Sequence, residues 1–192
     1  MKLIFFIAFS FLMNQTIFSQ IPDSTIEKAF ENYRPDQILR LIQRTDNLTQ
    51  DEKLKGYITE LSFRIPILNP IANQRITSKF GYRIHPITGE IKKHEGIDID
   101  GLRNQQVYAA ADGEITEVGY QHFLGNYVKI KHFLGYETIY GHLEEFIVEP
   151  NTHVYQGQVI GYCGSTGRTT GVHLHFSILW RGSFLNPYSF IF

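Results

Sequence analysis

Residues 127–132 read Tyr-Val-Lys-Ile-Lys-His, so apolar and charged side chains alternate along the chain. Successive side chains of a β-strand point to opposite faces, which would put Val128, Ile130 and His132 on one face of such a strand. Antiparallel sheets with one buried face produce this alternation. From Arg75 onward the chain consists of similar short β-rich runs. We therefore predict a mainly β domain here, built as an antiparallel β sandwich or open barrel.

Turn residues separate these runs and support the prediction. They include Asp112-Gly113, Gly125-Asn126 and Arg181-Gly182, and glycines recur from Gly164 to Gly171. Such residues form tight turns between neighbouring strands. Helical periodicity is scarce in this part of the chain. Because parallel βαβ units need helices between their strands, we expect an antiparallel sheet.

Residues 21–66 follow a helical pattern instead. Ser24-Thr-Ile-Glu27 and Thr49-Gln-Asp-Glu52 have the form of capping boxes, which begin helices. Three helices are predicted, near residues 25–33, 36–44 and 50–62. Pro66 and Pro70 then disfavour helix in the residues before them, so we place a linker there.

The N-terminus has the layout of a secretory signal peptide. One charge, Lys2, precedes the apolar run Leu3–Met13, and Ser19 is the small residue before the expected cleavage. A membrane-spanning helix needs about 20 apolar residues, and Asn14 interrupts this run earlier. We expect export to the periplasm, the cell envelope or the medium, without a membrane anchor after cleavage. The expected parts are a signal peptide (1–19), a helical segment with its linker (20–70) and a β domain (71–192).

Charge and cysteine content exclude several classes of protein. The chain has 18 Lys and Arg against 19 Asp and Glu, a net charge of −1. Binding of nucleic acids or acidic membranes needs a basic face that this balance does not supply, so neither partner is expected. Cys163 is the only cysteine, which rules out an intrachain disulfide. We expect it to be a small buried residue.

Four of the eight histidines stand, with one aspartate, in a suggestive spacing: His94-x-x-x-Asp98, His142 and His173-Leu-His175. A His-x-His strand points both imidazoles to one face, about 6.6 Å apart. On a straight strand His94 and Asp98 would be about 13 Å apart, so the chain must bend between them, and Gly96 permits a bend. His122 and His153 are expected to be ordinary surface or hydrogen-bonded residues.

Nitrogen and oxygen ligands without a thiolate suit zinc held by three protein groups and a water. The spacing supplies two histidines and a carboxylate for such a set, and two further histidines for proton transfer. Zinc lowers the pKa of its water to about 7, so hydrolysis of an amide is the natural reaction. Paired carboxylates placed for glycoside hydrolysis are not found.

Several motifs in the same order resemble the lysostaphin/LytM family of zinc endopeptidases over residues 75–190. They are Phe80–Gly89, His94–Asp98, Ala111–Gly113, Gly125–Val128, Tyr140–Leu143, Gln156–Gly161, Gly164–Phe176 and Asn186-Pro187. The resemblance implies that residues 71–192 form a zinc peptidase domain with a narrow groove and act on peptidoglycan peptides. It also implies zinc held by His94, Asp98 and His175, with His142 and His173 beside the catalytic water.

The resemblance leaves some questions open. Asn151 stands where the family often has glycine, a turn that asparagine can also make. We favour cleavage at D-Ala cross-links over glycine bridges, because no added wall-targeting domain is recognised. Which of His142 and His173 is the general base, whether a regulatory partner exists, and the role of residues 20–70 are left undecided.

Three alternative functions are less consistent with the sequence. A catalytically inactive LytM-like module that binds or activates a cell-wall hydrolase would look degenerate at the ligand positions, whereas all five polar residues are retained here. A biotinyl or lipoyl carrier needs a lysine on a hairpin, and no lysine follows Lys131. Tyr162–Thr169 loosely imitates a phosphate-binding loop but lacks its first glycine and its lysine.

Overall fold

The computed structural model describes residues 22–48, 52–72, 75–84 and 89–191. The chain divides into two compact units between Leu61 and Ser62. The predicted signal peptide (1–19) lies outside the described residues. Among the helices that are described, none is long and apolar enough to cross a membrane.

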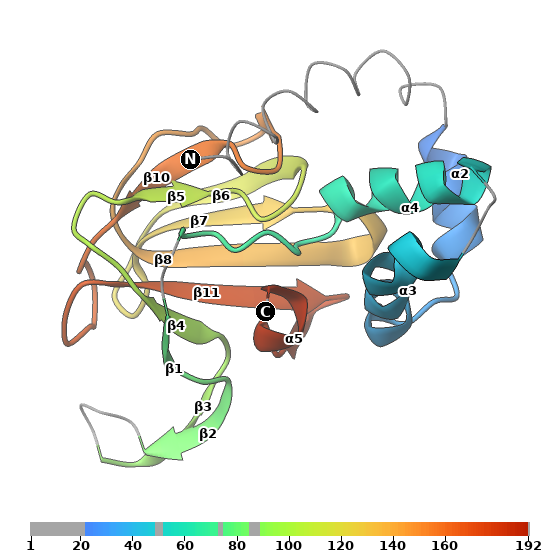
Figure 1. Ribbon diagram of the computed structural model, residues 1–192. Helices are drawn as coiled ribbons and strands as arrows, with labels where there is room; N and C mark the ends of the chain where they lie inside the picture. The colour runs from blue at the N-terminus through green and yellow to red at the C-terminus, as the bar shows by residue number, and fades with distance from the viewer. Residues whose placement is uncertain (1–21, 49–51, 73–74, 85–88, 192) are drawn as a thin grey trace. The chain divides into compact units, whose positions relative to one another are not determined.

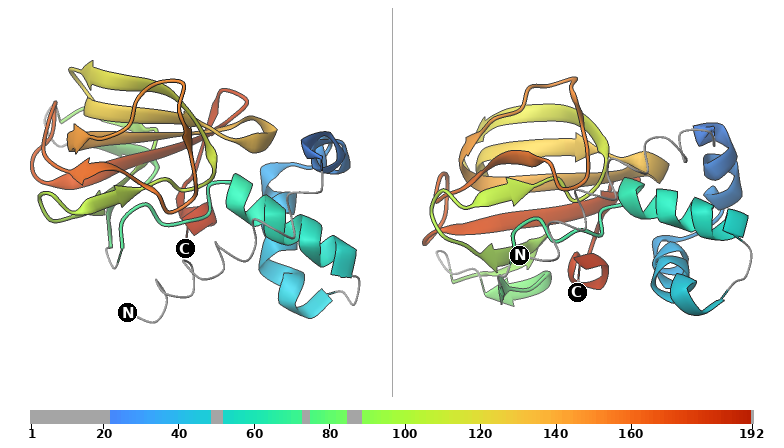
Figure 2. Two further views of the ribbon diagram at one scale, coloured as in Figure 1. Left: turned by 90° about the horizontal axis from the view of Figure 1, so that it is seen from above. Right: turned by 45° about the horizontal axis from the view of Figure 1, so that its top comes forward.

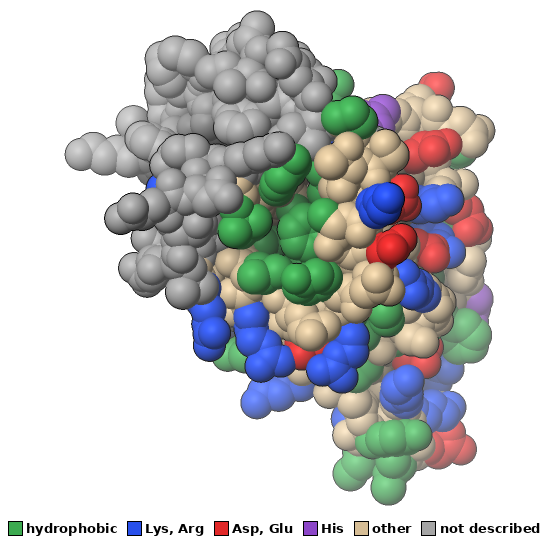
Figure 3. Space-filling model, turned by 90° about the vertical axis from the view of Figure 1, so that its right-hand side faces the viewer, with side chains coloured by type: hydrophobic (Ala, Val, Ile, Leu, Met, Phe, Trp, Pro, Cys, Tyr) green, Lys and Arg blue, Asp and Glu red, His purple; other side chains and the backbone are tan. Residues whose placement is uncertain are grey.

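Helices make up the described part of the first unit: α2 (Asp23–Phe30), α3 (Pro35–Leu48) and most of α4 (Glu52–Arg64) (Figure 1). These bounds confirm the three predicted helices within a few residues. Proline opens α3, a position where its missing N–H costs no hydrogen bond. Ile26 and Ile38 are at most 1% exposed and supply the apolar faces that such helices bury. Figure 3 shows one face of the molecule, on which hydrophobic side chains gather in a patch above a row of Lys and Arg side chains.

The second unit is built on an open antiparallel sheet of ten described strands, with the order β1-β4-β11-β8-β7-β6-β9; β10 pairs with β5 and β8, and β12 with β11 (Figures 1 and 2). The strands are β1 (Ile76–Ser78), β4 (Ile97–Asp100), β5 (Gln106–Tyr108), β6 (Gly113–Gln121), β7 (Gly125–Lys131), β8 (Tyr136–Phe146), β9 (His153–Val154), β10 (Val159–Cys163), β11 (His173–Trp180) and β12 (Ser183–Leu185). This confirms the predicted antiparallel β fold.

Smaller elements complete the unit. A two-stranded hairpin, β2 (Gly81–Ile84) and β3 (Ile91–His94), forms a separate sheet. A 3₁₀ turn, η1 (Phe133–Gly135), precedes β8, and the short helix α5 (Tyr188–Ile191) follows β12. The hairpin projects from the main sheet next to β1 and β4 (Figure 1).

The alternation predicted for residues 127–132 is present in β7. Val128 and Ile130 are fully buried and His132 is 5% exposed, so their common face packs into the core. Tyr127, predicted on the other face with the lysines, is also buried, and its hydroxyl donates to the carboxylate of Glu117 on β6. Large aromatic side chains can be covered on either face of a sheet, which alternation alone does not predict.

The stretch predicted as a linker is hydrogen-bonded to the β unit. The amide of Leu68 donates to the carbonyl of Ala110 (3.2 Å), and the amide of Tyr108 donates to the carbonyl of Pro70 (2.9 Å). Ile65, before this stretch, is fully buried. The prolines therefore end the helix, and the chain then continues along the β unit.

Strand register at the centre of the sheet determines where the polar residues of β11 and β4 lie. His175 is opposite Asp98 in β4 and opposite Gly141 in β8. Between the histidines of β11, Leu174 points into the core and is fully buried, as is Phe176. Burying each contributes about 1.5–3 kcal/mol, and a slip by one residue would expose both. Core packing thus keeps the polar face of β11 toward the pocket.

Candidate metal centre

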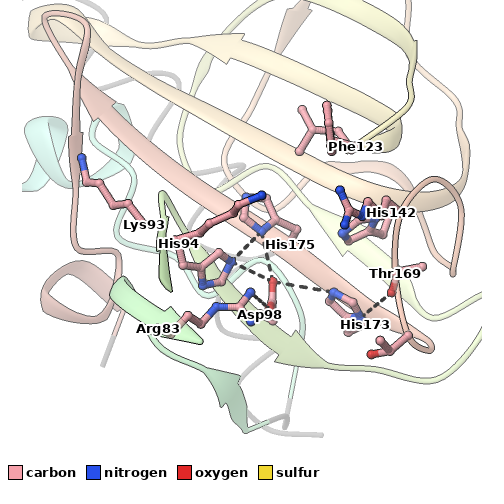
Figure 4. A pocket seen from close by; sticks show the side chains of 13 residues that line it. Arg83, Lys93, His94, Asp98, Phe123, His142, Thr169, His173 and His175 are labelled. Carbon is pink, nitrogen blue, oxygen red and sulfur yellow. Dashed lines mark hydrogen bonds and ion pairs between the residues drawn. The ribbon is translucent and has the colours of Figure 1, made fainter. Parts of the chain in front are cut away.

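The three residues implied as metal ligands lie together in the structure. Nε2 of His94 lies 3.2 Å from Oδ1 of Asp98 and 3.1 Å from Nδ1 of His175, and the last two atoms are 3.0 Å apart (Figure 4). Their side chains are 8–12% exposed. Among the described residues, these three form a group whose ligand atoms could hold one metal ion.

The bend predicted between His94 and Asp98 is present, because β3 ends at His94 and β4 starts at Ile97 in a different sheet. Gly96 lies at this bend and is buried against β11. A Cβ on Gly96 would lie 2.5 Å from the carbonyl oxygen of Phe176. Glycine is therefore needed for the close approach of the two backbones.

Hydrogen bonds behind the cluster fix which atoms face its centre. Nδ1 of His94 lies 2.9 Å from the carbonyl oxygen of Lys79, which can only accept, so that nitrogen carries the hydrogen and Nε2 presents a lone pair. Nε2 of His175 lies 3.0 Å from Oγ of Ser177. Such outer partners orient the ligands of metal sites.

This arrangement fits a bound cation. The lone pair on Nε2 of His94 faces the carboxylate oxygen of Asp98 at 3.2 Å, a repulsive contact unless a cation or proton is shared between them. Ligands placed about 2.0–2.1 Å from a tetrahedral zinc would lie about 3.4 Å from one another, close to the separations found here. The donor set and its spacing therefore match a metal ion.

Electrostatics keep the cluster in the state that a metal needs. Burial raises the pKa of Asp98, but the neighbouring imidazoles outweigh it, above all through the hydrogen bond with His175, and hold this pKa far below its usual range. Burial lowers the pKa of His175. A charged carboxylate and a neutral imidazole are thus available at neutral pH.

His142 and His173 stand beside the cluster. Their ring centroids are 4.7 Å apart, and that of His142 is 6.0 Å from that of His175. Nε2 of His173 lies 3.6 Å from Oδ1 of Asp98, and its Nδ1 lies 3.0 Å from the carbonyl of Gly171, to which it donates. As predicted, His173 and His175 share one face of β11, so all five residues lie together.

His142 has a strained backbone and a depressed pKa. Its φ of 60° is in the left-handed region, which costs a non-glycine residue about 1–3 kcal/mol and is frequent at functional sites. Its amide donates to the carbonyl of Leu124 (2.6 Å), and its Nδ1–H donates to the carbonyl of Thr166 (2.8 Å). Burial lowers its pKa to about 4, so the ring is neutral at pH 7 with a free lone pair on Nε2.

Two residues near the site had no role in the sequence analysis. Arg83 contacts the second oxygen of Asp98 (3.3 Å). The hydroxyl of Thr166 accepts from the amide of Asn126 (2.9 Å) and donates to the carbonyl of Leu143 (2.7 Å). Both residues stand in the family motifs, Arg83 in Phe80–Gly89 and Thr166 in Gly164–Phe176, but the resemblance implies no role for either of them.

The remaining predictions at single residues hold. Cys163 is fully buried, and burial raises the pKa of its thiol to about 11. His122 and His153 are exposed and contact neighbouring aromatic rings. His132, in contrast, is buried and hydrogen-bonded on both ring nitrogens.

The cluster opens into a pocket of about 210 Å³. One wall is the β2–β3 hairpin, which contributes Arg83, Lys92 and Lys93. The other includes Phe123, from the β6–β7 turn, and Arg168, from the loop between β10 and β11. The candidate metal ligands and both flanking histidines therefore line a pocket between the hairpin and the loops that carry Phe123 and Arg168.

Several known proteins are similar to this chain in sequence. The peptidoglycan DD-endopeptidase ShyC of Vibrio cholerae is 42% identical over 120 residues, 62% of this chain and 28% of ShyC. The DD-carboxypeptidase/endopeptidase Mpg of Neisseria meningitidis is 44% identical over 122 residues, 64% of this chain and 28% of Mpg. The chain thus matches little more than a quarter of the length of these relatives.

Solved structures of peptidases are similar to this chain as well. A zinc-containing peptidase from Vibrio cholerae superposes with a TM-score of 0.58 at 35% identity, covering 64% of this chain and 39% of that one. The catalytic domain of lysostaphin from Staphylococcus simulans has a TM-score of 0.56 at 29% identity and covers 62% and 92% of the two chains. The family model for peptidase family M23 matches residues 92–187, half of the chain. This protein belongs to peptidase family M23.

Proposed function

We propose that the β unit is a zinc metalloendopeptidase that hydrolyses peptide cross-links of bacterial peptidoglycan. The observation that carries the proposal is the cluster of His94, Asp98 and His175, whose ligand atoms face one another within 3.2 Å. Two nitrogens and one carboxylate oxygen form the usual protein ligand set of a catalytic zinc site, which keeps a further position open. These three residues would hold the metal.

Zinc at this position supplies a Lewis acid and a water of lowered pKa. This chain's own residues carry the protons, since amide hydrolysis removes one from the attacking water and delivers one to the leaving nitrogen. His142 is suited to accept a proton, because its ring is neutral at pH 7 and its Nδ1–H is held by Thr166. His173, 4.7 Å away, is the second carrier.

The substrate is proposed from the relatives and from the expected export. ShyC is named a peptidoglycan DD-endopeptidase, and Mpg is named a DD-carboxypeptidase/endopeptidase. We propose the D-Ala cross-link as the scissile bond, and the periplasm or cell envelope as the place of action. An inactive module is disfavoured, because all five polar residues are present and lie together with hydrogen-bonded support.

Digestion of purified peptidoglycan tests this function. Mass analysis of the products should show cross-linked dimers converted to monomers, with the disaccharides intact. The conversion should stop with a chelator and return with added zinc. Shortened glycan strands with uncut cross-links would contradict the proposal, as would digestion that a chelator leaves unchanged.

A further inference from the structure

The pocket at the candidate metal centre is positively charged. Among the described residues that line it, Arg83, Lys92, Lys93 and Arg168 are cationic, and Asp98 is the one acid. The whole chain has a net charge of −1, so this excess does not reflect a basic protein. A concave site with charges of one sign concentrates ligands of the other sign.

The hairpin cations already have partners. Arg83 contacts Asp98. Nζ of Lys92 lies 2.8 Å from a carboxylate oxygen of Glu90, where the two side chains are 47% and 65% exposed. Exposed ion pairs of this kind stabilise a protein by about 0–1 kcal/mol. Lys92 can therefore leave Glu90 and bind a ligand at little cost in free energy. Lys93 has a longer contact of 3.5 Å to Glu95.

Arg168 differs from these cations. No hydrogen bond or ion pair joins its guanidinium to any other residue in the described part of the chain; instead it stacks over the ring of Phe123, 5.7 Å from the centroid. Stacking on an aromatic face leaves the N–H groups at the edge of the guanidinium available. These donors form a fork that matches both oxygens of a carboxylate.

The loop that carries Arg168 is held firmly against the site. A Cβ on Gly167 would lie 2.2 Å from the amide nitrogen of Gly125, so the two segments touch closely. On the other side of Arg168, the hydroxyl of Thr169 lies 3.2 Å from Nδ1 of His173. Arg168 thus lies two residues after Thr166, whose carbonyl accepts from His142, and directly before Thr169, which contacts His173.

We propose that Arg168 binds a free carboxylate of the substrate peptide, with Lys92 on the opposite wall adding to the attraction. This inference rests on the proposed peptidase function and names its substrate class. The preferred substrates are cross-linked peptides that carry an ionised carboxyl group beside the scissile bond. Peptides in which that group is amidated, or bridges made of neutral residues, lack the partner for Arg168.

The test compares one cross-linked peptide dimer prepared in two forms, with its free carboxyl groups intact and with them converted to amides. For the wild-type chain loaded with zinc, we expect kcat/KM to be about 10- to 100-fold higher for the acid, as for a hydrogen bond to a charged group. The preference should weaken as salt is added. The Arg168→Gln variant should lose the preference through a higher KM for the acid, and Arg168→Lys should restore part of it.

Arg181→Gln is the matched control, because Arg181 also stacks on an aromatic ring, that of Trp180, but does not line the pocket. It should keep the preference. Equal cleavage of acid and amide by the wild type, or an unchanged preference in Arg168→Gln, would overturn the subsite while leaving the peptidase function intact. Should neither dimer be cut, the peptidase proposal fails, and calorimetric binding of both dimers still decides: tighter binding of the acid supports the subsite and equal binding overturns it.

Discussion

The guanidinium of Arg83 in β2 lies 3.3 Å from Oδ2 of Asp98 in β4, while the other oxygen of this carboxylate faces the histidines. The two side chains are 29% and 12% exposed. Arg83 therefore ties the separate hairpin to the candidate metal centre. It holds the carboxylate with one oxygen directed at His94 and His175, so that Asp98 would bind a metal ion through this single oxygen.

Replacing Arg83 with Gln should weaken zinc binding about 10- to 100-fold, the usual effect of losing an outer partner of a ligand. Competition with a chromogenic chelator measures this affinity. Arg75→Gln is the control, because Arg75 pairs with Asp100 but is 84% exposed. Equal zinc affinity in both variants would show that Arg83 does not position Asp98.

Replacing His94, Asp98 or His175 with Ala should lower the zinc content of the purified protein, since each is proposed to supply one of three ligand atoms. The triple replacement should contain almost none by elemental analysis. His153→Ala, which changes an exposed histidine outside the pocket, should keep a full equivalent. A full equivalent in the triple variant would contradict the ligand assignment.

His142→Ala and His173→Ala should behave differently from the ligand variants. Each should keep its zinc and lose about 100- to 10,000-fold in kcat, the usual range for general acid–base catalysis. Zinc content and turnover measured on the same preparations separate the two roles. Wild-type rates in both variants would exclude them as proton carriers.

How far could the site be anticipated? The period of two along β11 was enough to put His173 and His175 on one face, and the need for a bend at Gly96 followed from strand geometry. Both inferences depend on local backbone geometry alone. The resemblance to a known family then indicated which polar residues belong to one site.

The contacts that hold the site could not be predicted in the same way. Thr166 orients His142 through its backbone carbonyl, and every residue has a carbonyl, so no residue type marks that role. Arg83 reaches Asp98 from a separate two-stranded sheet, a placement that depends on how the hairpin packs. The burial of Tyr127 could not be predicted from alternation either, because its ring is covered on the face that it shares with the lysines.

A buried chain of hydrogen bonds makes stability depend on pH. Nδ1–H of His132 donates to the carbonyl of Asp112 (2.8 Å), and its Nε2 accepts from the hydroxyl of Thr138 (2.7 Å). That hydroxyl lies 3.1 Å from the one of Tyr140, which accepts from the amide of Ala110 (2.8 Å). The chain is complete with a neutral imidazole, and a second ring proton would place a positive charge at a fully buried position.

Burial accordingly lowers the pKa of His132 from 6.5 to about 4. Between these values the unfolded chain binds a proton that the folded chain does not, so this contribution to stability is full above pH 6.5 and is lost as the pH falls to 4. The loss amounts to about 3 kcal/mol.

Urea unfolding at pH 7 and pH 4.5 should show it for the wild type and for His122→Gln, which alters an exposed histidine. His132→Gln should lack this part of the pH dependence. If the free energy of unfolding falls equally between the two pH values in all three proteins, the assignment to His132 is refuted.

The hydroxyl of Thr166 holds the loop whose carbonyl orients His142, so its removal should affect turnover without affecting the metal. In Thr166→Val the side chain keeps its shape, but the bonds to the amide of Asn126 and the carbonyl of Leu143 are lost, at about 1 kcal/mol each. A shift of the loop by a fraction of an ångström would turn the imidazole away from the pocket. We expect kcat to fall about 10-fold at unchanged zinc content, because misplacing a catalytic group lowers the rate without removing a metal ligand.

Thr166→Ser, which keeps the hydroxyl, should restore the rate, and Thr116→Val, which removes a similar bond on β6, should not change it. Normal turnover in Thr166→Val would mean that the loop holds His142 without this hydroxyl.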